Sequence, residues 1–144
     1  IDTCGYAPQE NFEKVFPYVD TFLYDIKLMD DEKHKKYMGQ SNEMIFTNLK
    51  YLSEQGAKIY IRIPVIGGVN DSDEDMEAII EYLKGNIAVA QVNLLPYHDI
   101  ATSKYERLGL EYRGAEFTVP DNERMEELKY KFIQNGFSNT KIGG

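Results

Sequence analysis

The sequence predicts an α/β protein whose parallel strands are covered by outer helices, and two observations support this. Segments rich in β-branched and aromatic residues alternate with helical patterns along the 144-residue chain. Three of these segments lead to a polar residue at nearly equal spacing, since Asp25 and Arg62 are 37 residues apart (62 − 25) and Arg62 and His98 are 36 apart (98 − 62). A β–α unit takes roughly 30 residues or more, so each unit would bring one polar group to the same end of the sheet.

Three full strands are expected, at Thr21–Lys27, Lys58–Val65 and Ala90–Leu95. The third is almost continuously apolar, which is typical of a strand covered on both faces. Pro96 should end its ladder, because proline has no N–H to donate. Three strands are too few to close a barrel. A last short strand at Ser138–Ile142 would still leave an open sheet or a part of a larger one.

Helical patterns occupy the segments between the strands. The expected helices are Pro8–Val19, Asp31–Met38, Ser41 to Gln55, a segment beginning at Ser72 or Asp73, and Asn122–Asn135. Acidic residues open the helix Asp31–Met38, and Gly39 ends it. Met44, Ile45, Leu49 and Leu52 recur at helical spacing and predict the buried face of the third. His34 should lie on the solvated surface of its helix, among charged neighbours.

Composition limits the possible partners and locations. The chain has 24 acidic and 16 basic residues and a net charge of −8, so we expect no nucleic-acid partner. No apolar run approaches the roughly 18 residues of a membrane span, so we expect no membrane partner. A single cysteine, Cys4, excludes an intramolecular disulfide and suggests a reducing, cytoplasmic location. The abrupt start at Ile1, without an initiator methionine, predicts a single-domain fragment, residues 1–144.

The predicted strand ends carry the candidate site. Asp25 and Lys27 stand two apart and therefore face the same side of their strand. Such a pair can hold a zwitterion, help to chelate a cation, or simply neutralise itself. Arg62 lies in an apolar strand and needs a partner, because an unpaired buried charge costs several kcal/mol. Three possibilities for Arg62 remain open. It could pair with Asp25, pair with a bound anionic ligand, or reach toward water at the end of the strand.

Two further positions belong to the same predicted edge. Pro96 should make the chain leave the sheet and present His98 at the rim, where it could donate to a ligand or serve the structure alone. If Asp2 and Thr3 end a preceding strand, their oxygens lie beside Asp25, and hard oxygen groups suit a cation. The alternative for this pair is a helix cap.

The motifs taken together resemble one family. They are Asp2-Thr3-x-Gly5-Tyr6, Tyr24-Asp25-Ile26-Lys27, Lys33-His34-x-x-Tyr37-x-Gly39-x-Ser41-Asn42, Arg62-Ile63-Pro64, Asn70-Asp71, Leu94-Leu95-Pro96-Tyr97-His98 and Ser103-Lys104-Tyr105. In this order they resemble the glycyl-radical-enzyme activating enzymes, radical S-adenosylmethionine proteins that include pyruvate formate-lyase activase. The resemblance spans essentially the whole chain. One departure is Gly67, where the family usually has proline.

The resemblance implies a fold and a set of ligands. The family fold is a partial (β/α)6 TIM-like barrel, of which this chain would be the C-terminal half. The family holds a 4Fe-4S cluster on three cysteines of a C-x-x-x-C-x-x-C loop, which is absent here, so the cluster ligands would lie outside this chain. By resemblance, Asp25, Lys27, Arg62 and His98 bind S-adenosylmethionine, and Asp2 and Thr3 hold a monovalent cation with Asp25. No residue of this chain is expected to be catalytic.

The implied activity belongs to the full-length protein. It would cleave S-adenosylmethionine reductively to a 5′-deoxyadenosyl radical and generate a glycyl radical on a partner enzyme, with flavodoxin or ferredoxin as electron donor. The fragment alone would be inactive. A cluster-free α/β binding or scaffold domain derived from the same barrel is the alternative. A barrel lyase using Lys27 as a Schiff base is disfavoured, because a carboxylate two residues away would raise the pKa of the amine.

Overall fold

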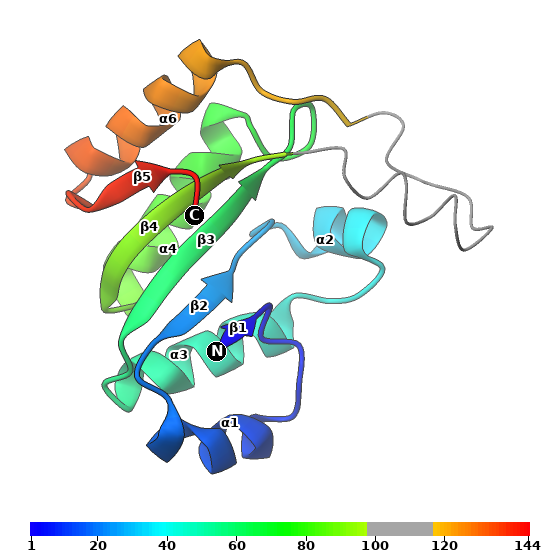
Figure 1. Cartoon of the computed structure of the whole chain (residues 1–144). Helices are drawn as coiled ribbons and strands as arrows, with labels where there is room; N and C mark the ends of the chain where they lie inside the picture. Colours follow the sequence, from blue (N-terminus) through cyan, green and yellow to red (C-terminus); the bar gives the residue numbers. More distant parts are fainter. Residues whose placement is uncertain (98–116) are drawn as a thin grey trace, which may run out of the picture.

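The computed structural model describes residues 1–97 and 117–144 and shows one parallel sheet (Figure 1). The five strands of the described residues lie in the order β1-β2-β3-β4-β5, and every neighbouring pair is parallel. Their bounds are β1 Asp2–Thr3, β2 Phe22–Asp25, β3 Ile59–Val65, β4 Val89–Pro96 and β5 Thr140–Ile142. The α/β fold with parallel strands and outer helices is therefore confirmed.

The helices connect successive strands. Their bounds are α1 Gln9–Val15 with the 3-10 turn η1 Phe16–Tyr18, α2 Asp31–Met38, α3 Glu43–Glu54, α4 Asp73–Asn86 and α6 Asn122–Gln134. Helices α1, α3, α4 and α6 pack on one face of the sheet, whereas α2 lies beyond the carboxyl end of β2 (Figure 1). Right-handed crossovers between strands that follow one another in sheet order place all connections on the same side. That arrangement is the one found along a section of a β/α barrel.

The alternation of burial along β3 separates the two faces of the sheet. Ile59, Ile61, Ile63 and Val65 are buried, whereas the residues between them, Arg62 included, are half-buried. The buried set packs against apolar side chains of α3, α4 and α6 in one core. The opposite face carries the half-buried residues of β2 and β3, and Asp25 and Arg62 face each other there in register.

Most predicted helix termini agree with the structure to within two residues. α2 has the predicted bounds; the Asp30 side chain accepts a hydrogen bond from the Lys33 N–H at 2.8 Å, and Gly39 caps its end. Ser72 accepts from the Asp75 N–H and caps α4. The predicted helix Pro8–Val19 was too long, because Pro17 interrupts the α-helical hydrogen bonding and the chain continues as η1.

Two predictions about buried faces were wrong. His34 is buried, 4% exposed, because its Nδ1 lies 2.6 Å from the Gln40 carbonyl and the turn between α2 and α3 closes over it. Met44 is 39% exposed, and Asn48 lies in the core instead. Asn48 donates to the carbonyls of Gly5 and Ala7 at 2.8 Å each, so its burial leaves no donor unsatisfied.

A second apolar cluster closes the carboxyl end of the sheet. Leu28, Ile66 and Val69 are buried there, with the half-buried rings of Tyr37, Tyr97 and Phe117 packed against them. The loop after β3 pairs with Thr118 through Gly67, whose N–H donates to the Thr118 carbonyl at 2.9 Å. A side chain on Gly67 would collide with Thr118, so the departure from proline at this position permits the close approach.

Candidate functional site

Arg62 and Asp25 form the centre of the site: Asp25 is the last residue of β2, and Arg62 lies beside it in the middle of β3 and not at its carboxyl end, where the sequence had placed it. The two residues are Cα partners in the parallel ladder, so their side chains leave the same face of adjacent strands. The Arg62 Nε donates to Asp25 Oδ1 at 2.7 Å, and Nη2 lies 2.7 Å from the same oxygen. Both side chains are 18% exposed. Of the partners left open for Arg62, the structure therefore shows Asp25.

Asp2 supplies a second carboxylate to the same guanidinium. The Arg62 Nη1 donates to Asp2 Oδ2 at 2.8 Å, and Nη2 bonds Asp2 Oδ1. The pair is bidentate, the geometry for which arginine is best suited. The Asp2 side chain is 63% exposed, much more than that of Asp25. Asp2 is thus the outer and Asp25 the inner carboxylate of one ionic group.

The charges around Arg62 set its protonation. Burial by itself would lower the pKa of the guanidinium, but the hydrogen bonds to Asp2 and Asp25 and the negative charge of both carboxylates raise it. Arg62 is therefore a fixed cation between two anions.

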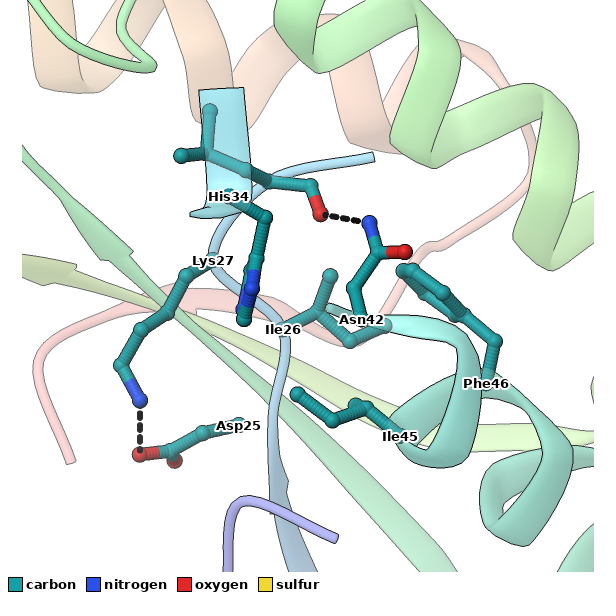
Figure 2. A pocket seen from close by; sticks show the side chains of 8 residues that line it. Asp25, Ile26, Lys27, His34, Asn42, Ile45 and Phe46 are labelled. Atoms are coloured by element: carbon teal, nitrogen blue, oxygen red, sulfur yellow. Dashed lines mark hydrogen bonds and ion pairs between the residues drawn. The ribbon is translucent and has the colours of Figure 1, made fainter. Parts of the chain in front are cut away.

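Lys27 joins the group from beyond the end of β2. Its Nζ lies 3.9 Å from Asp25 Oδ2, and its side chain is 28% exposed (Figure 2). The predicted strand ran to Lys27, but β2 ends at Asp25. The two side chains still lie together, and the long ion pair leaves the ammonium group free to contact a further anion.

Thr3 and His98 are the two remaining residues of the predicted site. Thr3 pairs in register with Tyr24, one residue before Asp25, and its Oγ1 accepts a hydrogen bond from the Gly5 N–H at 2.9 Å. Within the described residues, 1–97 and 117–144, no group of three or more acidic, histidine or cysteine side chains is placed so that it could hold a metal ion. The cation assigned to Asp2, Thr3 and Asp25 stays a prediction. His98 lies outside the described residues.

Polar residues that sequence reasoning did not assign to the site surround Lys27. His34 and Asn42 line a small cavity together with Asp25 and Lys27 (Figure 2). Asn42 donates to the carbonyls of Leu28 at 3.1 Å and Met29 at 2.8 Å. Both residues occur in the quoted Lys33–Asn42 motif. Their presence in that motif was the signal in the sequence that could have pointed to the site.

The arrangement suits a zwitterionic ligand. Lys27 and Arg62 provide two cationic groups and Asp25 and Asp2 two anionic ones, all at the carboxyl edge where α/β proteins bind ligands. A ligand carboxylate could bind Lys27 while a ligand amine binds Asp25. The open face of the sheet gives such a ligand access, because Asp25 and Arg62 are only half-buried.

Curated proteins match the chain along all or most of its length. It is 51% identical over 146 residues to the trans-4-hydroxy-L-proline dehydratase activating enzyme of Clostridioides difficile, covering 100% of this chain and 48% of that protein. It is 44% identical to the choline trimethylamine-lyase activating enzyme of Oleidesulfovibrio alaskensis, and the match covers 92% of this chain and 45% of that protein. The chain thus spans about half the length of the curated relatives it matches. No family model matches it.

Solved structures match the fold. A domain of pyruvate-formate lyase-activating enzyme from Bacteroides vulgatus superposes with a TM-score of 0.81 at 28% identity, covering 99% of this chain and 79% of that one. A radical SAM methyltransferase from Sphaerobacter thermophilus superposes with a TM-score of 0.69 at 20% identity. The match covers 99% of this chain and 39% of that one. The second likeness concerns the fold alone, as part of a larger barrel-type structure.

Proposed function

The chain belongs to the glycyl-radical-enzyme activating enzymes, a group of radical S-adenosylmethionine proteins, and we propose that the complete protein is such an activase. It cleaves S-adenosylmethionine reductively to a 5′-deoxyadenosyl radical and generates a glycyl radical on a partner enzyme. The observation that carries the proposal is the ionic group of Asp25, Lys27 and Arg62 at the carboxyl edge of the sheet. This chain supplies the cofactor-binding edge, as the C-terminal part of the barrel.

The side chains present fit the amino-acid end of S-adenosylmethionine. Lys27 would bind its carboxylate, because the ammonium group is 3.9 Å from Asp25 and has capacity for another anion. Asp25 would accept from its amine, and Arg62 would hold Asp25 in place through the bond from Nε. His98 is assigned to the same cofactor by resemblance. Fixing the ligand in this way orients the reacting sulfonium and removes the entropy cost of alignment.

The cluster requires residues from outside this chain. A 4Fe-4S cluster needs thiolate ligands, and the sequence contains one cysteine, Cys4. We propose that the 4Fe-4S ligands belong to another part of the full-length protein and that the chain by itself is inactive. The cluster would supply the electron for the reductive cleavage, with flavodoxin or ferredoxin as donor in the cytoplasm.

A monovalent cation belongs to the proposed ligand set. We assign a monovalent cation to Asp2, Thr3 and Asp25. Arg62 already places a positive charge between the two carboxylates, so the cation competes with the exposed Asp2–Arg62 pair. If the assignment is right, affinity for S-adenosylmethionine rises when potassium replaces a bulky organic cation at constant ionic strength.

The proposed partner is suggested by similarity to curated activating enzymes. Because the chain is 51% identical to the hydroxyproline dehydratase activating enzyme and 37% identical to the 4-hydroxyphenylacetate decarboxylase activating enzyme of Clostridium scatologenes, we propose a dehydratase-type glycyl radical enzyme as the protein substrate. Among residues 1–97 and 117–144, no helix is long and apolar enough to cross a membrane.

The full-length protein, reconstituted anaerobically with iron and sulfide, tests the proposal. Under reductant it should form 5′-deoxyadenosine from S-adenosylmethionine, and mixing with a hydroxyproline dehydratase should give the doublet of a glycyl radical in electron paramagnetic resonance. The Asp25→Ala variant is the control and should lose cofactor cleavage.

Absence of product from a fully loaded wild-type protein would reject the activase function and favour a cluster-free scaffold role. Product with an unchanged rate in Asp25→Ala would reject the assignment of Asp25. Product without a glycyl radical on the dehydratase would reject the proposed partner and direct the same assay to choline lyases and decarboxylases.

A further inference from the structure

The backbone directly after the ionic group is held by a buried asparagine. Asn70, 1% exposed, lies in the loop between β3 and α4. Its Nδ2 donates to the carbonyl of Lys27 at 2.7 Å and to that of Pro64 at 2.9 Å, and its Oδ1 accepts from the Ile66 N–H at 2.8 Å. A single side chain therefore ties the end of β2 to the end of β3.

Asn42 continues the same arrangement by one residue. It is 5% exposed and donates to the carbonyl of Leu28 (Figure 2) and to that of Met29. Its own N–H is fixed by Asp31 Oδ1 at 2.9 Å. The carbonyls of three successive residues, 27 to 29, are thus each bonded by a buried side-chain amide. The backbone of Lys27 is held even though the ladder of β2 ends at Asp25.

The side chain of Lys27 has much weaker restraints than its backbone. Its described ion pair, to Asp25, is 3.9 Å long, and lysine keeps considerable rotamer freedom when it is not tightly bound. The position of its ammonium group consequently depends on where the backbone places Cα. Asn70 is too buried to reach a ligand on the open face, so it can act on a ligand only through the backbone that it holds, and of the residues it bonds Lys27 is the one whose side chain joins the ionic group.

We propose that Asn70 is a positioning residue: it fixes the backbone of Lys27 and thereby sets the position from which the ammonium group binds the carboxylate of S-adenosylmethionine. The role of Lys27 in this statement rests on the function proposed above. The bond from Asn70 to the Lys27 carbonyl does not depend on that function, and its effect on the backbone can be measured without any cofactor.

The test compares Asn70→Asp with a matched control in the full-length protein. Aspartate keeps the shape of asparagine but removes both N–H donors and faces two carbonyls with a carboxylate. The control is Asn48→Asp, since Asn48 is also 1% exposed and also donates to two carbonyls, at Gly5 and Ala7. If Asn70→Asp does not fold, Asn70→Ser enters the same measurements.

The first measurement is hydrogen–deuterium exchange of the ligand-free protein. The amide to follow is that of Ile26, which donates to the Arg62 carbonyl at 2.9 Å directly before Lys27. We expect it to exchange about tenfold faster in Asn70→Asp, as the loss of the buried bond to the Lys27 carbonyl predicts. In Asn48→Asp this amide should keep the wild-type rate. An unchanged rate at Ile26 in Asn70→Asp overturns the proposal, whether or not the protein binds S-adenosylmethionine.

The second measurement is a double-mutant cycle on the affinity of the cluster-loaded protein for S-adenosylmethionine, by calorimetry. Asn70→Asp should weaken binding about tenfold in the wild type and less than about twofold in a Lys27→Met background, because the two residues act as one unit. Asn48→Asp should have the same effect in both backgrounds.

The outcomes of the cycle separate two failures. Equal losses from Asn70→Asp with and without Lys27 overturn the positioning role, because the damage is then general. A wild-type protein that binds no S-adenosylmethionine refutes the proposed function. In that case the part of the proposal that concerns Lys27 and its ligand falls too.

Discussion

At the scale of single residues, the chain places one arginine between two carboxylates of unequal exposure. Arg62 bonds both Asp25, which is 18% exposed, and Asp2, which is 63% exposed. An ion pair in water contributes little, because solvent screens it and the side chains lose entropy. A partly buried pair that loses one member leaves a desolvated charge without a partner. The two carboxylates should therefore differ in their contribution to stability.

Substitution of each carboxylate by its amide tests this difference. Asp25→Asn should lower the free energy of unfolding by about 1.5–3 kcal/mol, as the loss of a charged hydrogen bond does, whereas Asp2→Asn should lower it by less than about 1 kcal/mol. Urea unfolding at neutral pH measures both. Equal losses would mean that exposure does not govern the strength of the two pairs.

Gly5 provides a second prediction at this scale. Its φ is +77°, and a Cβ built there would collide with the hydroxyl of Tyr24, which is fully buried and donates to the Ile45 carbonyl at 2.6 Å. Gly5→Ala should cost more than the roughly 1–2 kcal/mol of a left-handed backbone alone. Gly56→Ala is the matched control, because φ is +79° there and no atom lies within 4 Å of the added Cβ.

Thermal unfolding of the two glycine variants isolates the collision. The melting temperature should fall by more in Gly5→Ala than in Gly56→Ala, since both share the backbone strain. If both fall equally, Tyr24 can move aside, and the hydrogen bond to Ile45 does not hold it.

At the scale of elements, the turn between α2 and α3 depends on Asp31. Its carboxylate lies 2.7 Å from Lys35 Nζ and accepts from the Asn42 N–H at 2.9 Å. The bond from Lys35, followed by those from Asn42 and Ser41, lowers the pKa of Asp31 to about 2 from the ordinary 3.8. Since Asn42 also holds residues 28 and 29, this turn is linked to the backbone of the site.

The lowered pKa of Asp31 fixes how the free energy of unfolding depends on pH. Asp31 binds a proton less readily in the folded than in the unfolded state, so its stabilising contribution is complete above the ordinary pKa of about 4 and is lost as the pH falls toward 2. The difference in unfolding free energy between wild type and Asp31→Asn should be constant near neutrality and shrink below pH 4. Urea titrations from pH 2 to 7 measure it, and a difference independent of pH would contradict the mechanism.

The elements also show how far local patterns reach. Asp30, acids in the first turn and Gly39 specify the two ends of α2, and the predicted bounds agree with the structure. The buried face of α3 was predicted in part, because Ile45, Leu49 and Leu52 are buried but Met44 is exposed. Hydrophobicity favoured Met44 over Asn48. Only the approach of the Gly5 and Ala7 carbonyls gives Asn48 the partners that make its burial favourable.

At the scale of the whole molecule, the described residues form part of a barrel section. The sheet exposes the face that carries the ionic group, and the chain spans about half of its curated relatives. The one cysteine of the sequence cannot provide the thiolate set of a cluster. The 144-residue chain, incubated anaerobically with iron and sulfide, should take up no 4Fe-4S cluster and release no 5′-deoxyadenosine.

Iron and labile sulfide analysis of that chain, beside the full-length protein treated identically, checks this expectation. Uptake of a stable cluster by the chain would show that ligands other than cysteine hold it and would contradict the division of the barrel proposed here.

The sequence by itself determined the parallel α/β fold, the strands that carry Asp25 and Arg62, and the bounds of α2. Periodicity, capping residues and spacing are local or regular properties that a single chain displays. The tertiary structure decided that Asp2 shares Arg62 with Asp25, that His34 is buried, and that Asn70 and Asn42 hold the backbone after Asp25. The contacts of Asp2, Asn70 and Asn42 join separate segments of the chain, whereas His34 meets the Gln40 carbonyl in the turn that follows its own helix. A polar side chain is buried where folding brings it a partner, and its own sequence neighbourhood does not specify that partner.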